Sequence, residues 1–230
     1  MKLPRKPAAV IFDMDGLIFD TEALYQQAFI EAASAAGYDV PIAVIQQTIG
    51  TTWVHSSDIF SAHLGPVFRP DEFFKDLGSR FDQLALTDLR LKDGVLELLD
   101  MLDNAGIPRC IATSSGHATV QNHLSAHGLA ERFEHVVGHG DYAESKPAPE
   151  PFLKAAARLD VDPKLCVALE DSFNGIRSAS AAGMMVIMVP DLVQPTPEIE
   201  ALATLVVPDL FVVADLLIEV LSPYGLHEIR

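Results

Sequence analysis

Residues 10–22 read VIFDMDGLIFDTE. The stretch opens with Val-Ile-Phe, an apolar run typical of a buried strand. Where a core would continue, the chain instead places Asp13 and Asp15 two residues apart, followed by Gly16 and, further on, Asp20. Carboxylates are costly to bury without a partner. We therefore expect this strand to deliver them to a site at its carboxyl end.

Similar apolar runs recur along the chain and alternate with amphipathic stretches of helical spacing. They occupy residues 8–14, 108–114, 133–138, 165–171, 185–190 and 203–208. This alternation predicts an α/β fold in which a Rossmann-like parallel sheet has helices on both faces. Two of the intervening helices are expected to end at Gly106 and Gly183, because glycine readily adopts the left-handed conformation that closes a helix.

One interval breaks the alternation. Between residues 20 and 92 there are helix-like segments but no convincing strand run. Such a connection far exceeds the about 2–6 residues usual between a strand and a helix. The sequence therefore predicts an inserted helical cap domain over residues 20–92, and a core domain formed by residues 1–19 and 93–230. The core of the cap is expected to contain Phe60, Phe73, Phe74 and Phe81.

The composition narrows the possible partners. Thirty-two acidic residues against sixteen Lys and Arg give a formal net charge of -16, which repels nucleic acid polymers and anionic membranes. The basic start of the chain is interrupted by Asp13 before it could form a signal peptide, and no later stretch has the length of a membrane span. Cys110 and Cys166 lie in apolar runs, which favours buried thiols in a reducing compartment. We expect a cytoplasmic monomer.

Polar residues follow each of the main predicted strands. They are Asp13 and Asp15, then Thr113, Ser114 and Ser115, then Lys146, and finally Glu170 and Asp171. The carboxyl ends of parallel strands meet at one edge of the sheet, where ligands bind. Packing has no use for acids, hydroxyls and an amine at that edge. The sequence thus predicts that they form one site.

The residue types indicate what this site binds. Converging carboxylates repel one another unless a cation lies between them, and all-oxygen ligands suit Mg²⁺. Asp13, Asp15 and Asp171 are the candidate ligands. A lysine together with hydroxyls and backbone amides suits the oxygens of a phosphate group. The predicted ligands are therefore Mg²⁺ and a small phosphorylated molecule.

No Ser-His-Asp or Cys-His arrangement supplies a nucleophile, which leaves an aspartate for that role. A carboxylate can attack phosphorus and form an aspartyl-phosphate. If Asp13 attacks, Asp15 is placed to protonate the leaving group and then to activate water. This chemistry explains why a buried strand ends in two carboxylates.

Each motif taken singly also has a plain structural interpretation. Asp13 to Gly16 could suggest a calcium loop, but an EF-hand needs its glycine at the sixth position and Gly16 is at the fourth. The hydroxyls of residues 113–115 could cap the following helix. Lys146 could be an exposed lysine, and the acids at 170 and 171 could simply begin a helix. Their joint occurrence favours the functional interpretation.

The sequence also resembles a known family. DMDGLIFDTE, TSS, KPAPEPF and EDSFNGIRSASAAGM, in this order, are similar to the motifs of the haloacid dehalogenase superfamily of phosphatases, and they span essentially the whole chain. The insertion after the first motif resembles the subgroup with a helical C1 cap, which includes β-phosphoglucomutase, phosphoglycolate phosphatase and pseudouridine-5'-phosphatase.

The resemblance implies a role for each matching residue. Asp13 would be the nucleophile, and Asp15 the acid/base and a metal ligand through its main-chain carbonyl. Ser114 would bind phosphate, with Gly16, Thr113 and Ser115 around it. Lys146 would neutralise charge, and Asp171, with Glu170 beside it, would complete the metal site.

Two departures bear on the activity. Dehalogenases of the superfamily lack the second aspartate, whereas Asp15 is present. The mutase branch has a histidine and an arginine where this chain has Tyr25 and Trp53, the latter in a predicted cap loop, GTTWVHSS, residues 50–57. We expect Tyr25 and Trp53 to contact substrate. The leading interpretation is a phosphatase, the alternative is a phosphomutase, and the third is a non-catalytic phosphate- or Mg²⁺-binding module, against which the intact Asp13 and Asp15 pair argues.

Overall fold

A computed structural model describes residues 2–48 and 53–221 of the chain. The chain divides into two compact units. The larger comprises Met1–Phe19 with Leu91–Arg230, and the smaller comprises Asp20–Arg90. Within the described ranges, no helix combines the length and the apolar character needed to cross a bilayer.

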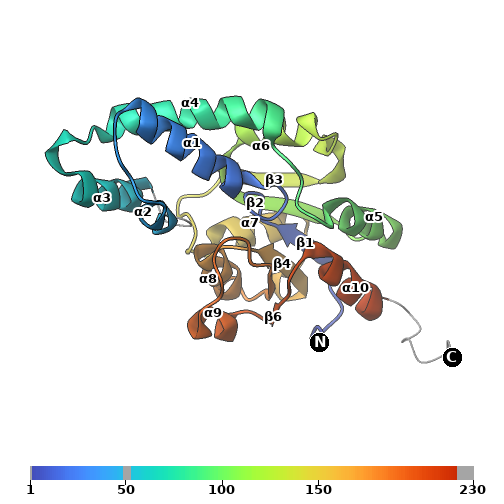
Figure 1. The fold of residues 1–230 in the computed structure, drawn as a ribbon. Coiled ribbons are helices and arrows are strands. Elements are labelled where there is room, and N and C mark those ends of the chain that lie inside the picture. The colour runs from blue at the N-terminus through green and yellow to red at the C-terminus, as the bar shows by residue number, and fades with distance from the viewer. Residues whose placement is uncertain (1, 49–52, 222–230) are drawn as a thin grey trace. The chain divides into compact units, whose positions relative to one another are not determined.

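The larger unit is built on a parallel sheet of six strands (Figure 1). The strands are β1 (Ala9–Phe12), β2 (Arg109–Gly116), β3 (His135–His139), β4 (Cys166–Glu170), β5 (Met185–Met188) and β6 (Leu205–Val206). Their order in the sheet is β3-β2-β1-β4-β5-β6, and every pair is parallel. The predicted Rossmann-like α/β fold is confirmed.

Helices cover both faces of this sheet because its central strands are apolar throughout. On one face, α7 (Glu150–Arg158) and α8 (Phe173–Ala181) share a buried cluster with β-strand residues such as Ile11 and Ala168. Right-handed crossovers place the helices that precede β2 and β3 on the opposite face. These are α5 (Val95–Ala105) and α6 (His117–Ala126).

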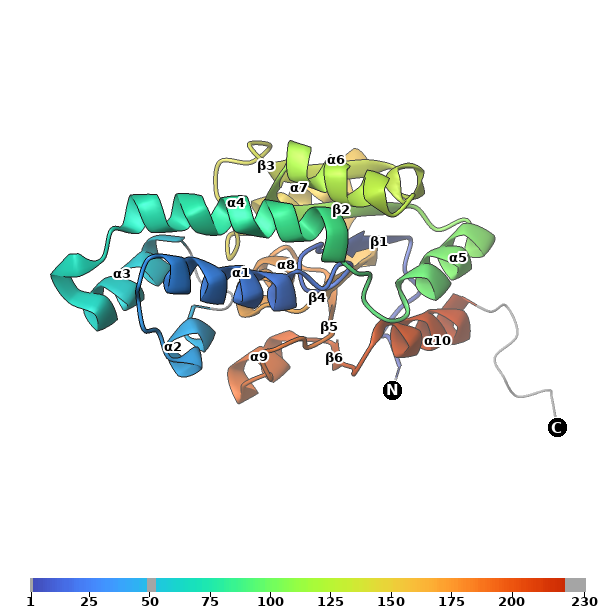
Figure 2. The ribbon, with the colours of Figure 1, turned by 45° about the horizontal axis from the view of Figure 1, so that its top comes forward.

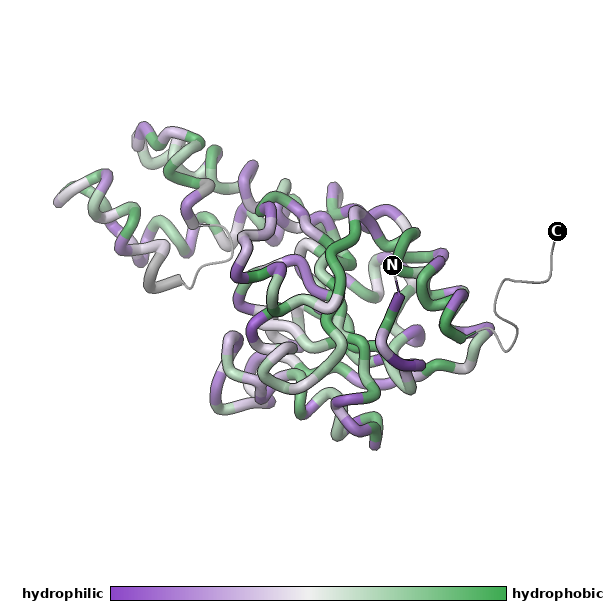
Figure 3. The backbone as a smooth tube through the Cα atoms, turned by 90° about the horizontal axis from the view of Figure 1, so that it is seen from below, coloured by the Kyte–Doolittle hydropathy of each residue, from purple (hydrophilic) through white to green (hydrophobic). Residues whose placement is uncertain are grey.

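The helix α10 (Leu210–Leu221) packs beside α5, as Figures 1 and 2 both show. A short helix, α9 (Pro197–Leu202), precedes β6. Hydrophobic and hydrophilic residues alternate along the helices in Figure 3. This alternation is typical of helices with one buried face. The helix α5 ends at Gly106, whose φ of 63° is the left-handed conformation that the sequence predicts there.

The strand order fixes where a site can form. From β1 the chain runs outward in one direction to β2 and β3, then returns to the other side of β1 for β4 to β6. The reversal lies between β1 and β4, and ligands bind beyond the carboxyl ends of strands at such a point. Phe12 is level with Ile111 of β2 and Leu169 of β4, so Asp13 emerges beside the ends of both neighbours.

The smaller unit is helical. It consists of α1 (Thr21–Ala35), α2 (Ile42–Gln46), α3 (Trp53–Leu64) and α4 (Pro70–Asp88), and α1 packs along α4. Phe29, Phe60 and Phe73 form its buried centre, with the Phe29 and Phe60 rings 4.6 Å apart. Phe74 and Phe81 are partly buried against this cluster.

The prediction of a loop over residues 50–57 is wrong from Trp53 onward. Residues from Trp53 onward form the first turns of α3, while residues 50–52 lie outside the described ranges. The helix is stabilised by burial, because Phe60 and Leu64, four residues apart, both pack into the aromatic core of the unit.

Candidate active site

Lys146 and Asp13 form the centre of the site. Asp13 follows β1 directly, and Lys146 lies in the loop between β3 and α7. The Lys146 Nζ donates hydrogen bonds to Asp13 Oδ1 at 2.5 Å and to Glu170 Oε1 at 2.5 Å. Only 8% of Lys146 and 7% of Asp13 is exposed, so the interpretation of Lys146 as an exposed lysine is wrong.

Glu170 is the fully buried last residue of β4. While Oε1 accepts from Lys146, Oε2 accepts from the Ser172 N–H at 3.1 Å and the Ser172 hydroxyl at 3.0 Å. The same hydroxyl accepts from the Gly175 N–H at 3.1 Å and so caps α8. Glu170 therefore precedes the helix, and the interpretation of this acid as a helix start is wrong.

Two glycines make room for the carboxylates. A Cβ on Gly175 would lie 1.7 Å from Glu170 Oε1, and a Cβ on Gly16 would lie 2.4 Å from Asp171 Oδ2. Gly16 also has a φ of +80°, which other residues rarely adopt. Both positions thus require glycine, and Gly16 brings the loop after β1 against Asp171.

Three carboxylates converge at this point. Oxygen atoms of Asp13, Glu170 and Asp171 all lie within 4.8 Å of one another, and all three residues are buried. This all-oxygen donor set fits a hard divalent cation. Among the described residues, the Asp15 side chain is not part of this cluster. The sequence predicted a cluster of Asp13, Asp15 and Asp171, and the structure has Glu170 in the place of Asp15.

The electrostatics of the cluster also suit a cation. Burial raises the pKa of Asp13 to about 8; Lys146 opposes the shift, while Glu170 and Asp15 add to it. For Lys146, burial acts to lower the pKa, but the attraction of Asp13 and Glu170 outweighs it and raises the pKa. The one positive charge of Lys146 does not balance the negative charges of Asp13, Glu170 and Asp171. A divalent cation would hold Asp13 in its ionised form.

Asp15 has a separate set of partners at the end of β2. Its Oδ2 accepts hydrogen bonds from the Ser115 hydroxyl at 2.7 Å and the Thr113 hydroxyl at 3.3 Å. The Thr113 hydroxyl in turn accepts from the Ser115 N–H at 3.0 Å. Ser114, between them, has an exposed side chain. The two aspartates of the first motif therefore have different hydrogen-bond partners, Lys146 for Asp13 and two hydroxyl groups for Asp15.

These hydroxyls do not cap the next helix. The N-cap residue of α6 is Gly116, and the helix has no side-chain capping hydrogen bond. The capping interpretation of residues 113–115 is therefore wrong. Their hydroxyls are instead oriented by Asp15 and by one another.

Sequence reasoning missed three residues that support the site. Ser172 and Gly175 shape the surroundings of Glu170, as described above. Tyr142, in the loop that also carries Lys146, donates its hydroxyl hydrogen to the Thr113 carbonyl oxygen at 3.1 Å. The fragment EDSFNG offered a signal for Ser172, since a serine before a helix commonly caps it. No signal pointed to Tyr142, whose hydroxyl interacts with the Thr113 carbonyl oxygen and with the Ser114 side chain.

Tyr25 and Trp53 belong to the smaller unit, whereas every other predicted site residue belongs to the larger. Tyr25 packs against the aromatic core, with its ring 6.4 Å from that of Phe81. Burial, aided by Glu22, raises the pKa of Tyr25 to about 12. Trp53 is the first residue of α3, and its side chain lies outside the described part of the structure.

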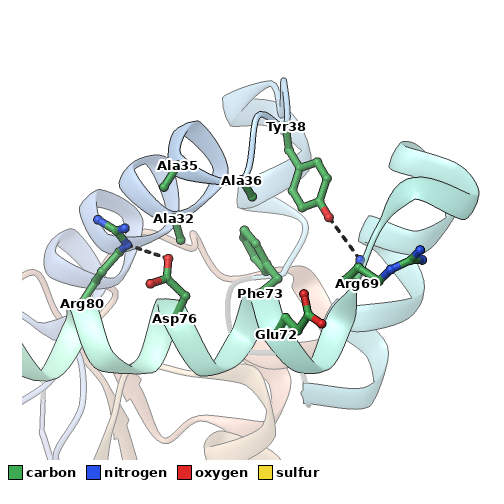
Figure 4. Close-up of a pocket in the computed structure, with 9 residues that line it drawn as sticks. All are labelled: Ala32, Ala35, Ala36, Tyr38, Arg69, Glu72, Phe73, Asp76 and Arg80. Atoms are coloured by element: carbon green, nitrogen blue, oxygen red, sulfur yellow. Dashed lines mark hydrogen bonds and ion pairs between the residues drawn. The ribbon is translucent and has the colours of Figure 1, made fainter.

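A separate cavity of about 290 Å³ lies within the smaller unit, between α1 and α4 (Figure 4). Two arginines and two acids line it, and Arg80 Nε lies 2.7 Å from Asp76 Oδ2. The Tyr38 hydroxyl accepts from the Arg69 N–H at 3.2 Å. With its charges balanced, this cavity lacks the excess positive charge that a phosphate needs, and we place no phosphate site there.

The sequence of the chain is similar to those of known proteins. Residues 10–189 match the family model for haloacid dehalogenase-like hydrolases. The chain is 35% identical over 196 residues to the Drosophila melanogaster protein named "Probable pseudouridine-5'-phosphatase", covering 83% of this chain and 84% of that protein. It is 32% identical over 194 residues to hexitol phosphatase B of Escherichia coli K12, covering 83% and 86% of the two chains.

A solved structure is similar as well. The crystal structure of CbbY from Rhodobacter sphaeroides in complex with phosphate has a TM-score of 0.73 to this chain and 27% identity, and the match covers 89% of this chain and 95% of that one. The predicted resemblance is thereby confirmed. The chain belongs to the haloacid dehalogenase-like hydrolase family, as one of its phosphoric monoester hydrolases.

Proposed function

We propose that the protein is a Mg²⁺-dependent phosphatase that hydrolyses a small phosphorylated metabolite, a sugar phosphate or similar phosphomonoester, through an aspartyl-phosphate at Asp13. The observation that carries this proposal is that the two aspartates of the first motif have different hydrogen-bond partners. Asp13 is bonded to Lys146 and lies within the buried acid cluster, while Asp15 is bonded to the hydroxyls at the end of β2. The two carboxylates can therefore perform different tasks.

In the first step, an Asp13 carboxylate oxygen attacks phosphorus, and the bond from phosphorus to the ester oxygen breaks. Asp15 donates its proton to the leaving oxygen. Lys146, already 2.5 Å from Asp13, offsets the negative charge of the phosphoryl oxygens as they approach. The Ser114 hydroxyl and the Ser114 backbone N–H bind those oxygens, because the Thr113 and Ser115 hydroxyls already donate to Asp15.

In the second step, water attacks the same phosphorus atom and Asp15 takes its proton. Inorganic phosphate leaves, and the Asp13 carboxylate is restored. Asp13, Glu170 and Asp171, with the Asp15 carbonyl, would hold Mg²⁺, which supplies positive charge to the phosphoryl group when it is bound.

We also propose that the unit Asp20–Arg90 is a cap domain that selects the substrate, with Tyr25 and Trp53 among its contacts. Water as the acceptor is favoured because the histidine and arginine of the mutase branch are absent at these two positions. Cys110 and Cys166 are both free and buried, which supports a reducing location such as the cytoplasm.

The direct test is a panel of phosphorylated metabolites incubated with the protein and Mg²⁺, with free phosphate and remaining ester both measured. We expect phosphate release in step with substrate loss for at least one sugar phosphate or related ester. Conversion of β-glucose 1-phosphate to glucose 6-phosphate faster than phosphate release would instead establish the mutase alternative. No turnover of any ester would overturn the proposed function.

A further inference from the structure

Tyr142 connects two loops of the site. It lies in the segment between β3 and α7, four residues before Lys146, and its hydroxyl donates to the Thr113 carbonyl oxygen at 3.1 Å at the end of β2. Its ring is half-buried against the cluster formed by the sheet, α7 and α8. The hydroxyl is therefore held on a packed ring rather than on a mobile side chain.

The loop that carries Tyr142 is anchored at its base. Asp141 Oδ2 accepts a hydrogen bond from the Gly138 N–H at 3.0 Å and lies 2.9 Å from His117 Nε2. Arg158, from α7, lies 3.1 Å from the other Asp141 oxygen. These contacts attach the residue next to Tyr142 to β3, α6 and α7, so the direction of the Tyr142 side chain is well defined.

The hydrogen bond to Thr113 has a consequence for the next residue. The Thr113 carbonyl and the Ser114 N–H belong to one planar trans peptide, in which they point in opposite directions. Fixing the carbonyl from the side of Tyr142 therefore fixes the direction of the Ser114 N–H. Backbone N–H groups with a fixed direction bind anionic oxygens most effectively when they need not reorient.

We propose that Tyr142 is a positioning residue for phosphate binding. Its hydroxyl holds the Thr113–Ser114 peptide so that the Ser114 amide donates to a phosphoryl oxygen, and it couples this segment to the loop that carries Lys146. The inference rests on the proposed function and adds to it a residue outside the family motifs quoted above. It assigns Tyr142 an effect on affinity for the phosphate group, with the chemical step unaltered.

The test uses Tyr142→Phe, which keeps the ring and removes only the hydroxyl. The control is Tyr38→Phe, because the Tyr38 hydroxyl also donates to a backbone carbonyl at 3.1 Å, that of Val67, in the smaller unit. Three quantities are measured with Mg²⁺ present: steady-state kinetics on p-nitrophenyl phosphate, the Kd of inorganic phosphate by calorimetry, and Tm.

For Tyr142→Phe we expect KM and the Kd of phosphate to rise together by about fivefold to tenfold, with kcat changed by less than about twofold. Tyr38→Phe should leave both constants unchanged. If Tyr142→Phe lowers Tm while KM and Kd keep their wild-type values, the hydroxyl is merely structural and the inference is wrong. Absence of phosphate binding by the wild type would also overturn it.

The two proposals fail in different ways. If the wild type hydrolyses no phosphomonoester, the proposed function is lost, and the comparison of phosphate affinities still decides the role of Tyr142. If the wild type hydrolyses its substrate and Tyr142→Phe is indistinguishable from it in KM and Kd, only the inference on Tyr142 is lost.

Discussion

The Lys146 ammonium group lies 2.5 Å from Asp13 Oδ1 although the two residues are 133 positions apart in the chain, and both side chains are at least nine-tenths buried. The end of one strand and a loop form this contact, since Asp13 directly follows β1 and Lys146 lies in the loop between β3 and α7. A buried pair of this kind adds little to stability, because desolvation of both groups opposes their attraction. In the proposed mechanism, the pair places positive charge beside the carboxylate that attacks phosphorus.

Replacing Lys146 should therefore reduce activity strongly. Lys146→Ala leaves Asp13 and Glu170 buried without their shared cation, so we expect kcat to fall by about a hundredfold to a thousandfold and Tm to decrease. Steady-state kinetics and thermal unfolding measure both effects. Lys2→Ala is the control, because Lys2 is 81% exposed and pairs only with a surface acid, Glu219, in the described structure. Equal kcat/KM for the two variants would remove Lys146 from the site.

Gly175 should tolerate no side chain. In Gly175→Ala the new Cβ would overlap the Glu170 carboxylate, so we expect that carboxylate to shift away from Lys146, with a loss of both stability and activity. Gly78→Ala is the matched control, since Gly78 lies within α4 with no neighbour close to its would-be Cβ. That substitution should raise stability by about 1 kcal/mol. A Gly175→Ala protein with wild-type kcat and Tm would contradict the packing described for Glu170.

The raised pKa of Asp13 predicts how stability varies with pH when no metal is bound. The folded protein holds a proton on Asp13 up to about pH 8, whereas the unfolded chain loses it near pH 4. A carboxyl with a raised pKa contributes most to stability at low pH, and this contribution is lost as the pH rises toward 8. We expect Tm in EDTA to fall more steeply between pH 5 and 9 for the wild type than for Asp13→Asn. Parallel pH profiles would contradict this assignment.

Metal binding should reverse that trend. A cation among Asp13, Glu170 and Asp171 displaces the proton from Asp13, so Mg²⁺ should raise Tm more at pH 8 than at pH 6. Hydrolysis should stop in EDTA and return when Mg²⁺ is added in excess. Asp171→Asn should lose most of the Mg²⁺-induced rise in Tm. Full hydrolysis in the chelator would show that no divalent cation is needed.

Much of the larger unit could be predicted from the sequence, for a physical reason. Parallel strands covered on both faces are continuous apolar runs, so β1 and β4 stand out against the amphipathic helices around them. Polar residues at the carboxyl ends of such runs lie at one edge of the sheet, so Asp13 and Glu170 could be placed together from the sequence, and Lys146 could be assigned to the loop that follows β3 at the same edge.

Contacts between side chains and backbone could not be predicted in the same way. Nothing in the sequence shows that Tyr142 binds the Thr113 carbonyl, because every residue offers that acceptor. Asp15 was expected beside the metal from its type alone, yet its carboxylate faces the Ser115 hydroxyl, 100 positions away. The start of α3 was also missed, since its first residues carry no apolar repeat and the helix is stabilised by Phe60 further along.

In the proposed mechanism, Asp13 becomes phosphorylated and Asp15 transfers protons. Asp15→Asn with p-nitrophenyl phosphate separates the two roles. Nitrophenolate leaves without a proton, so the first step needs no acid, whereas hydrolysis of the aspartyl-phosphate still needs Asp15 as a base. The phosphorylated enzyme should therefore accumulate in this variant and not in Asp13→Asn.

The measurement is an acid quench of Asp15→Asn during turnover with Mg²⁺, followed by mass spectrometry of its peptides. We expect one phosphoryl group per chain, on the peptide that contains Asp13, together with a burst of nitrophenolate of the same size. A phosphoryl group on any other residue, or steady turnover by Asp13→Asn at the wild-type rate, would show that the proposed mechanism is wrong.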